Sequence, residues 1–156
     1  MTDEPQGWRR PRLVPPVYFL ASLALMEALH RWWPIAQTWQ APVIHVGWVL
    51  LALGLVMILS ALGAFSRAAT GIVPFSEATA MVTSGFYRVT RNPMYLGMVL
   101  ILAGIATLRG TLASFLPIPL FAWVIHSRFI LREERFMEEA FGAQYLAYKA
   151  RVRRWL

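Results

Sequence analysis

Long apolar runs separated by short polar stretches dominate the chain. Four runs approach the roughly 20 apolar residues that a helix needs to cross the hydrocarbon core of a bilayer. Backbone amides in hydrocarbon must find their partners within the segment, so each run predicts a helix. The pattern predicts an all-α integral membrane bundle with four transmembrane helices, over residues 14–33, 43–65, 93–108 and 112–131.

The polar stretches divide this bundle. Residues 66–92 form the longest internal polar stretch, whereas Arg109-Gly110-Thr111 is so short that the last two helices are expected to form a tight hairpin. Charged residues follow the fourth run and predict a cytosolic helical extension, which we call the C-terminal cap. We expect a single membrane domain over residues 1–156, built from an N-terminal helix pair (13–65), a cytosolic loop (66–92) and a hairpin with its cap (93–156).

Composition and charge agree with this pattern. Hydrophobic residues make up 58% of the chain, charged residues 15%, and the mean hydropathy is +0.51. All Lys and Arg residues except Arg31 and Arg109 fall in the N-terminal tail, the 66–92 loop or the C-terminal region. The positive-inside rule then places both termini and the loop in the cytosol. The net charge of +7 is assigned to contact with anionic lipid rather than nucleic acid.

Several function classes are excluded or disfavoured. Arg9-Arg10 precedes an apolar run that is too long for a signal peptide and has no cleavage site, which predicts an uncleaved first helix. The chain has no cysteine, and its three histidines lack metal-ligand spacing. We therefore predict no metal site.

The excess of arginine over lysine indicates a bacterial genome and hence an inner-membrane protein.

Small residues recur at intervals of seven in two of the predicted helices. Gly47, Gly54 and Ala61 follow this spacing in the second helix, and Gly97 and Gly104 follow it in the third. Such stripes allow close approach of helix backbones in a bilayer. They predict a packing seam and say nothing about activity.

The first helix carries two ionisable residues on one face, Glu27 and His30. Ionisable residues inside a membrane span are candidates for function. The aromatic pair Trp32-Trp33 lies nearby, as expected at a membrane interface. We favour an interfacial pair over a functional one.

The start of the third helix is the first candidate site. Asn92 is a favoured N-cap residue and Pro93 suits the first helical position, so unpaired amides there are expected to attract an anion. Arg91 offers a fork for a carboxylate, and Tyr87 and Tyr95 offer aromatic faces. An arginine anchor, a helix cap and two interfacial tyrosines would give the same pattern, so this alternative stays open.

The second candidate site lies in the charged extension of the fourth helix. Apolar residues from Phe129 to Phe141 recur on one helical face, and Glu133 lies among them. Partial desolvation disfavours the charged form of such a carboxylate. Glu134 borders the stripe, whereas Glu138 and Glu139 are expected in water. Together the two sites complement a zwitterion such as S-adenosyl-L-methionine, although other zwitterions fit the same charges.

The order of motifs over residues 70–156 resembles the isoprenylcysteine carboxyl methyltransferase family and its phospholipid methyltransferase relatives. The motifs are Gly85-x-Tyr87, Arg91-Asn92-Pro93-Met94-Tyr95-Leu96-Gly97, a helix hairpin, Glu133-Glu134, Phe141-Gly142-x-x-Tyr145-x-x-Tyr148 and Val152-x-Arg154. The family pattern has histidine where this chain has Asn92, which leaves the acceptor open. The resemblance implies S-adenosyl-L-methionine as cofactor, bound at the cytosolic ends of the last two helices.

By the same resemblance, Arg91 and Glu134 lie nearest the methyl acceptor and are the expected catalytic residues. The expected cofactor-binding residues are Tyr87, Asn92, Pro93, Tyr95, Gly97, Glu133, Tyr145 and Tyr148. Arg91 would orient a carboxylate acceptor, and Glu134 would take the proton of an amine.

The resemblance therefore implies a membrane methyltransferase that uses S-adenosyl-L-methionine and acts on a lipid or lipid-like acceptor, with carboxyl O-methylation of the isoprenylcysteine type favoured. Headgroup N-methylation is one alternative. A non-catalytic membrane scaffold or sensor that retains the fold is another. The sequence gives no indication of oligomeric state.

Overall fold

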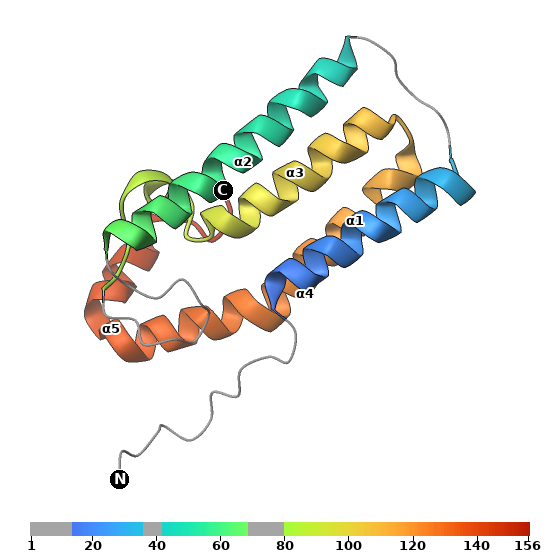
Figure 1. The fold of residues 1–156 in the computed structure, drawn as a ribbon. Helices are drawn as coiled ribbons and strands as arrows, with labels where there is room; N and C mark the ends of the chain where they lie inside the picture. The colour runs from blue at the N-terminus through green and yellow to red at the C-terminus, as the bar shows by residue number, and fades with distance from the viewer. Residues whose placement is uncertain (1–13, 36–41, 69–79) are drawn as a thin grey trace.

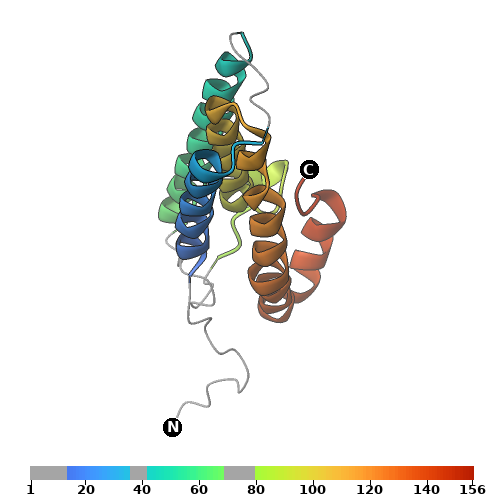
Figure 2. The same ribbon diagram turned by 90° about the vertical axis from the view of Figure 1, so that its right-hand side faces the viewer.

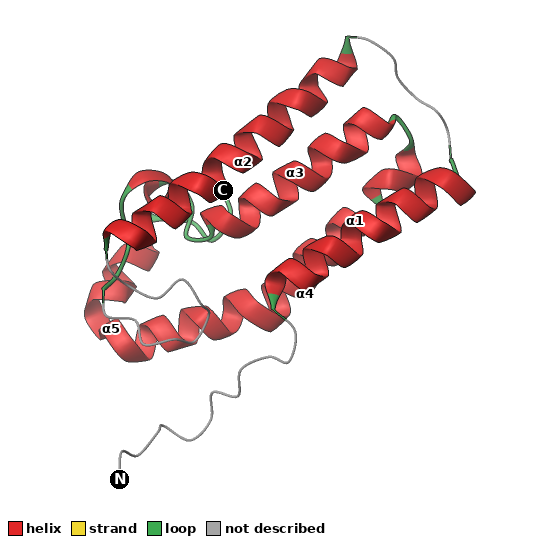
Figure 3. Ribbon diagram, viewed as in Figure 1, coloured by secondary structure: helices red, strands yellow, loops and turns green. Residues whose placement is uncertain are grey.

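The computed structural model describes residues 14–35, 42–68 and 80–156, and in these residues every regular element is a helix (Figures 1 and 3). The expected all-α class is thus confirmed over the described chain. Arg9, Arg10 and residues 69–79 of the predicted 66–92 loop lie outside the described residues. In chain order the elements are α1 (Pro15–Trp32), α2 (Val43–Arg67), η1 (Gly85–Arg88), α3 (Pro93–Arg109), η2 (Leu112–Phe115), α4 (Pro117–Ile125), the π-helix η3 (His126–Ile130) and α5 (Leu131–Arg151).

Helix boundaries follow the sequence pattern closely, with one difference. The third helix begins at Pro93, as predicted, and ends at Arg109; Gly110 follows as a left-handed C-cap with a φ of 68°. The predicted fourth helix opens instead with the 3-10 turn η2. It then runs continuously through α4 and η3 into α5, as far as a kink at Gly142.

Two helical stretches in the described residues are long and apolar enough to cross a membrane, Val43–Arg67 and Leu112–Arg151. The apolar part of the second ends near Leu131, because charged side chains follow from Arg132 onward. Helix α3 has 17 residues and α1 carries Glu27 and Arg31. The structure therefore supports a helical membrane protein, while the count of four spans remains a prediction.

The outward face of α2 shows what surrounds the bundle. Val46, Val49, Leu53 and Val56 are all more than 40% exposed, at 53%, 64%, 43% and 54%. A continuous apolar stripe of this kind is costly in water and favourable in lipid. The surface of α2 thus agrees with a membrane location.

Helices α2 and α3 run side by side along the bundle (Figure 1) and meet at the predicted glycine seam. A Cβ added to Gly54 would lie 2.5 Å from the carbonyl oxygen of Gly97, and one added to Gly47 would lie 2.9 Å from that of Gly104. Backbones this close leave no room for side chains. The predicted packing role of these glycines is confirmed.

Helix α1 lies against α4 on the other side of α3, as the turned view also shows (Figure 2). The fully buried side chains there come from α1, α3, α4 and η3, and include Met26, Leu102, Phe121, Ile125 and Phe129. These side chains form one apolar core cluster that packs α1, α3, α4 and η3 together.

Polar side chains tie α1 to the α3–α4 connection at one end of the bundle. Glu27 forms an ion pair with Arg109, and His30 Nδ1 lies 3.2 Å from the hydroxyl of Thr111. That hydroxyl in turn lies 2.7 Å from the hydroxyl of Ser114. Glu27 and His30 thus make interhelical contacts far from the residues of the candidate site.

Two local features direct the chain from α4 back to the start of α3. The π-helix η3 inserts one wider turn just before α5. Gly142 then adopts φ 48°, ψ −124° within α5, a conformation open to glycine but costly for other residues. The last turns of α5 and the C-terminal tail consequently return to residues 90–92, near the start of α3 (Figure 1).

Candidate active site

The C-terminal tail lies across the segment that leads into α3. Thr90 and Arg153 form a parallel β-bridge, and the Arg91 amide donates to the carbonyl of Arg153 at 2.9 Å. The Thr90 hydroxyl donates to the carbonyl of Arg154 at 3.1 Å. Thr90 is fully buried. The tail is therefore a fixed part of the structure around the α3 start.

Arg91 joins three parts of the chain. Its Nη1 donates to the carbonyls of Val152 and Lys149, at 2.6 and 3.2 Å. Its Nη2 donates to Glu134 Oε1 at 2.8 Å. Its Nε is buried without a partner among the described residues. Both terminal nitrogens of Arg91 are thus engaged inside the protein.

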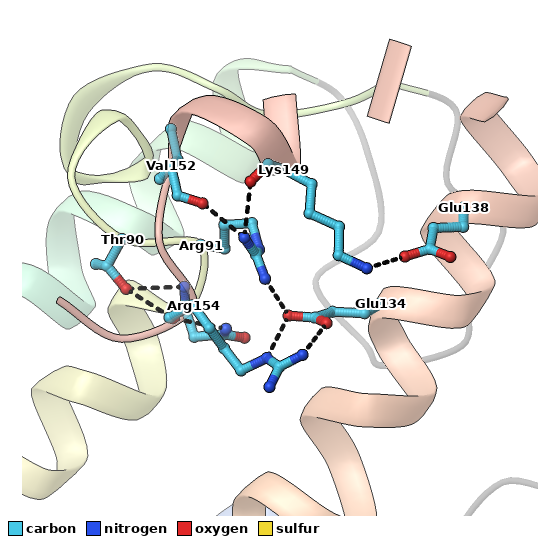
Figure 4. A network of polar contacts seen from close by, with 8 residues as sticks. Thr90, Arg91, Glu134, Glu138, Lys149, Val152 and Arg154 are labelled. Atoms are coloured by element: carbon cyan, nitrogen blue, oxygen red, sulfur yellow. Dashed lines mark hydrogen bonds and ion pairs between the residues drawn. The ribbon is translucent and has the colours of Figure 1, made fainter. Parts of the chain in front are cut away.

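Glu134 is held by two arginines (Figure 4). Besides Arg91, Arg154 donates to it through Nε at 2.8 Å and through Nη2 at 2.7 Å. We call Arg91, Glu134 and Arg154 the clasp. Burial by itself raises the pKa of Glu134, but the hydrogen bonds from Arg154 and Arg91 outweigh it and hold that pKa below its ordinary value. Glu134 therefore stays ionised near neutral pH.

Glu133 has a different environment from its neighbour. It accepts one hydrogen bond, from the hydroxyl of Tyr95 on α3, at 2.7 Å, and no cation contacts it among the described residues. Burial raises the pKa of Glu133 to about 7; the hydrogen bond from Tyr95 lowers it and the charge of Glu134 adds to the rise. The two adjacent carboxylates thus differ in charge state and in partners.

Asn92 occupies the predicted N-cap position, but its side chain makes no capping bond. Its Nδ2 instead donates to the carbonyl of Arg154 at 3.0 Å. The expected capping contact is thus replaced by a contact with the tail. Pro93 begins α3 as expected and is buried, and Gly97 faces α2 across the glycine seam.

The three predicted tyrosines around the cap lie together. The hydroxyl of Tyr148 donates to the carbonyl of Tyr87 at 2.7 Å, and the rings of Tyr145 and Tyr148 are 6.1 Å apart. Burial raises the pKa of Tyr148 to about 12. It also raises the pKa of Tyr87 and Tyr145. All three hydroxyls are therefore protonated at physiological pH.

The structure thus brings the two predicted sites together through two contacts, Arg91 with Glu134 and Tyr95 with Glu133. Pro93 and Gly97 also belong to this start of α3. Sequence reasoning missed the part played by Arg154 and Thr90. Arg154 belongs to the Val152-x-Arg154 motif, which was the one signal that pointed to it. The functional roles of all these residues stay predictions.

Comparisons with known proteins bear on the family. A family model described as phospholipid methyltransferase matches residues 43–144. Protein-S-isoprenylcysteine O-methyltransferase A of Arabidopsis thaliana is 26% identical over 136 residues, which cover 86% of this chain and 65% of that protein. Protein-S-isoprenylcysteine O-methyltransferase of Schizosaccharomyces pombe is 33% identical over 72 residues, 46% of this chain and 30% of that protein. An uncharacterised Haemophilus influenzae protein is 41% identical over 63 residues, 40% of this chain and 100% of that protein.

No solved structure matches the chain significantly. The chain spans about two thirds of the length of the Arabidopsis relative. The match to the phospholipid methyltransferase model covers more than half of the sequence and includes the glycine seam, Arg91 and both glutamates. These matches confirm the resemblance inferred from the motifs. The chain therefore belongs to the phospholipid methyltransferase family.

Proposed function

We propose that this protein is a membrane methyltransferase that uses S-adenosyl-L-methionine and methylates a carboxylate on a lipid-like acceptor. The observation that carries the proposal is the pair of adjacent glutamates with opposite environments beside the start of α3. Arabidopsis and fission yeast relatives named as isoprenylcysteine O-methyltransferases favour a carboxylate acceptor.

The residues present suit a zwitterionic methyl donor. Within the described chain Glu133 has one hydrogen-bond partner and no counter-ion, so it can face a positive sulfonium. The amides that open α3 attract a carboxylate, and the buried aromatic rings of Tyr87, Tyr145 and Tyr148 lie near Glu133 and the clasp. Asn92, Pro93 and Gly97 shape the backbone beneath it. The donor, when bound, supplies an electrophilic methyl group.

The protein's part in such a reaction is alignment. An in-line transfer needs no covalent intermediate with the enzyme, and correct positioning accounts for several kcal/mol of barrier lowering. Arg91 and Glu134 hold the tail and the α3 start together next to the acceptor. The apolar helices exclude water and let a lipophilic acceptor enter from the bilayer, while both termini and the site face the cytosol, in the bacterial inner membrane.

Headgroup N-methylation is the second candidate. An ammonium acceptor must lose a proton before transfer, and a carboxylate with a pKa near 7 suits that task. Glu133 fits this description better than Glu134, which is held ionised by two arginines. A non-catalytic scaffold or sensor remains the third candidate.

Transfer of a labelled methyl group in detergent micelles tests the proposal. Purified protein with labelled S-adenosyl-L-methionine is expected to methylate a farnesylated cysteine with a free carboxylate and to leave phosphatidylethanolamine unlabelled. The reverse result would support N-methylation. Cofactor binding without transfer to either acceptor would favour a sensor, and no binding at all would favour the scaffold.

Replacing Glu133 with glutamine is expected to weaken binding of S-adenosyl-L-methionine about tenfold or more, because a charge-assisted contact to the sulfonium is lost. The protein should still fold, since Glu133 has a single hydrogen-bond partner in the part of the chain that the structure describes. Isothermal titration calorimetry in detergent measures the change. Glu139→Gln, at an exposed position of the same helix, is the matched control, and equal affinities in the two variants would contradict the role of Glu133.

Cofactor affinity should also depend on pH. Glu133 is mostly protonated below its pKa of about 7 and ionised above it, so affinity for a sulfonium rises as the pH passes upward through that value. Tyr95→Phe removes the hydrogen bond that lowers this pKa, and should move the midpoint to higher pH. Glu133→Gln should flatten the profile. Titrations with S-adenosyl-L-methionine between pH 5.5 and 8.5 measure the affinity of the wild type, Tyr95→Phe and Glu133→Gln. A wild-type affinity that does not change with pH would rule out a contact between ionised Glu133 and the sulfonium.

A further inference from the structure

The clasp carries more positive than negative charge. One carboxylate, Glu134, accepts from two guanidinium groups, those of Arg91 and Arg154. The three side chains therefore keep one net positive charge. The clasp lies where residues 90–92 lead into α3, whose first amides add positive potential. This end of the site is thus suited to an anionic group.

Only one of the two cations in the clasp is open to a ligand. The side chains of Arg91 and Glu134 are 8% and 7% exposed, whereas that of Arg154 is 33% exposed. Both terminal nitrogens of Arg91 are occupied. Arg154 Nη1, by contrast, meets no acceptor among the described residues and points away from Glu134 in Figure 4. The free donor edge of the clasp therefore belongs to Arg154.

We propose that Arg154 is the residue that binds the carboxylate of a ligand, and that Arg91 holds Arg154 and Glu134 in place. The inference rests on the proposed function and assigns the ligand contact within that site. Arg154 donates to Glu134 through Nε and Nη2, and these two hydrogen bonds fix the plane of the guanidinium and leave Nη1 directed outward. The carbonyl of Arg154 is itself held by Thr90 and Asn92. Both the backbone and the guanidinium of Arg154 are thus held in place before a ligand binds.

The carboxylate has two possible sources, the methyl donor and the acceptor, and Arg154→Gln separates them. If the donor supplies it, the Kd for S-adenosyl-L-methionine should rise about 10- to 100-fold while the Kd for its decarboxylated analogue stays unchanged. If the acceptor supplies it, the Kd for the donor should stay unchanged and the KM for farnesylcysteine should rise by a similar factor. Either result supports the proposal.

Arg153→Gln is the matched control. It makes the same charge change at the preceding position, where the side chain is exposed and forms no ion pair with the described residues. It should leave the Kd for the donor and the KM for farnesylcysteine unchanged. Arg154→Gln behaving like Arg153→Gln would overturn the proposal, and so would an equal loss of affinity for the donor and its decarboxylated analogue, which would indicate a merely structural role.

Arg154→Lys covers the case in which the glutamine variant does not fold. Lysine retains the ion pair with Glu134 but lacks the second, outward-facing donor edge. A selective loss of affinity for the carboxylate-bearing ligand is again expected. An unselective loss of affinity, or no loss, counts against the proposal. Wild-type protein that fails to bind the donor would instead refute the proposed function, and this inference with it.

Discussion

Glu134→Gln is expected to loosen the C-terminal tail and to destabilise the protein by about 3–5 kcal/mol, because it leaves the buried guanidinium of Arg91 without a counter-charge. Both side chains of that pair are less than a tenth exposed. Thermal unfolding in detergent measures the stability. Hydrogen exchange at the Arg91 amide, which is bonded to the carbonyl of Arg153, reports on the tail.

Glu138→Gln provides the control for this variant. Glu138 pairs with Lys149 on the same helix, but both side chains are about one third exposed. Ion pairs at such positions contribute about 1 kcal/mol or less. If the two variants unfolded alike and the Arg91 amide exchanged no faster in Glu134→Gln, the clasp would have no stabilising role.

The clasp also predicts the direction of acid sensitivity. The pKa of Glu134 in the folded protein lies below its ordinary value of 4.5. Its contribution to stability is therefore complete above 4.5 and is lost as the pH falls through the folded-state pKa. The wild-type tail should thus stay attached at mildly acidic pH, whereas the tail of Glu134→Gln should be loose at every pH.

Gly54→Ala is expected to be the most damaging single methyl addition in the membrane-spanning region. The new Cβ would lie 2.5 Å from the carbonyl oxygen of Gly97 and 3.0 Å from the amide nitrogen of Ile101. Both are backbone atoms of α3, so the helices must separate to relieve the clash. Overpacking of this kind typically costs about 1–3 kcal/mol, and rigid backbone places this site at the upper end. Thermal unfolding in detergent checks the loss.

Gly63→Ala makes the same chemical change in the same helix. Among residues 14–35, 42–68 and 80–156, its Cβ would meet only the end of the flexible Arg67 side chain, at 3.4 Å. Alanine there should be neutral or stabilising by up to about 1 kcal/mol, since it favours the helix. Opposite signs for the two variants would establish that close α2–α3 contact, rather than helix propensity, makes glycine necessary at position 54. Equal effects would contradict this reading of the seam.

The sequence predicted those parts of the fold that depend on local periodicity. The spacing of Gly47 and Gly54 indicated the seam because residues seven apart share a helical face. Asn92-Pro93 located the start of α3 because their preferences act within one turn. The 3-10 turn η2 was missed, since an apolar run alone does not reveal where its first residues leave the helix.

The pairings within the candidate site were less accessible to sequence reasoning. An arginine beside a helix start has the same local pattern whether it faces a ligand or a glutamate, so nothing near Arg91 indicated its contacts with Glu134 and the tail. Those contacts depend on the wide turn η3 and on the reversal at Gly142. The Asn92 side chain is a second example. It was expected to cap a local backbone amide, but it donates instead to the distant carbonyl of Arg154.

The hydrogen bond between Thr90 and Arg154 joins residues 64 positions apart. Closing so long a stretch is entropically unfavourable until the intervening helices have packed and shortened the distance that remains. During biogenesis the helical bundle can thus assemble first, and the contacts between the C-terminal tail and the start of α3 can form later. An early intermediate would already be stably inserted in the membrane but would still lack catalytic activity.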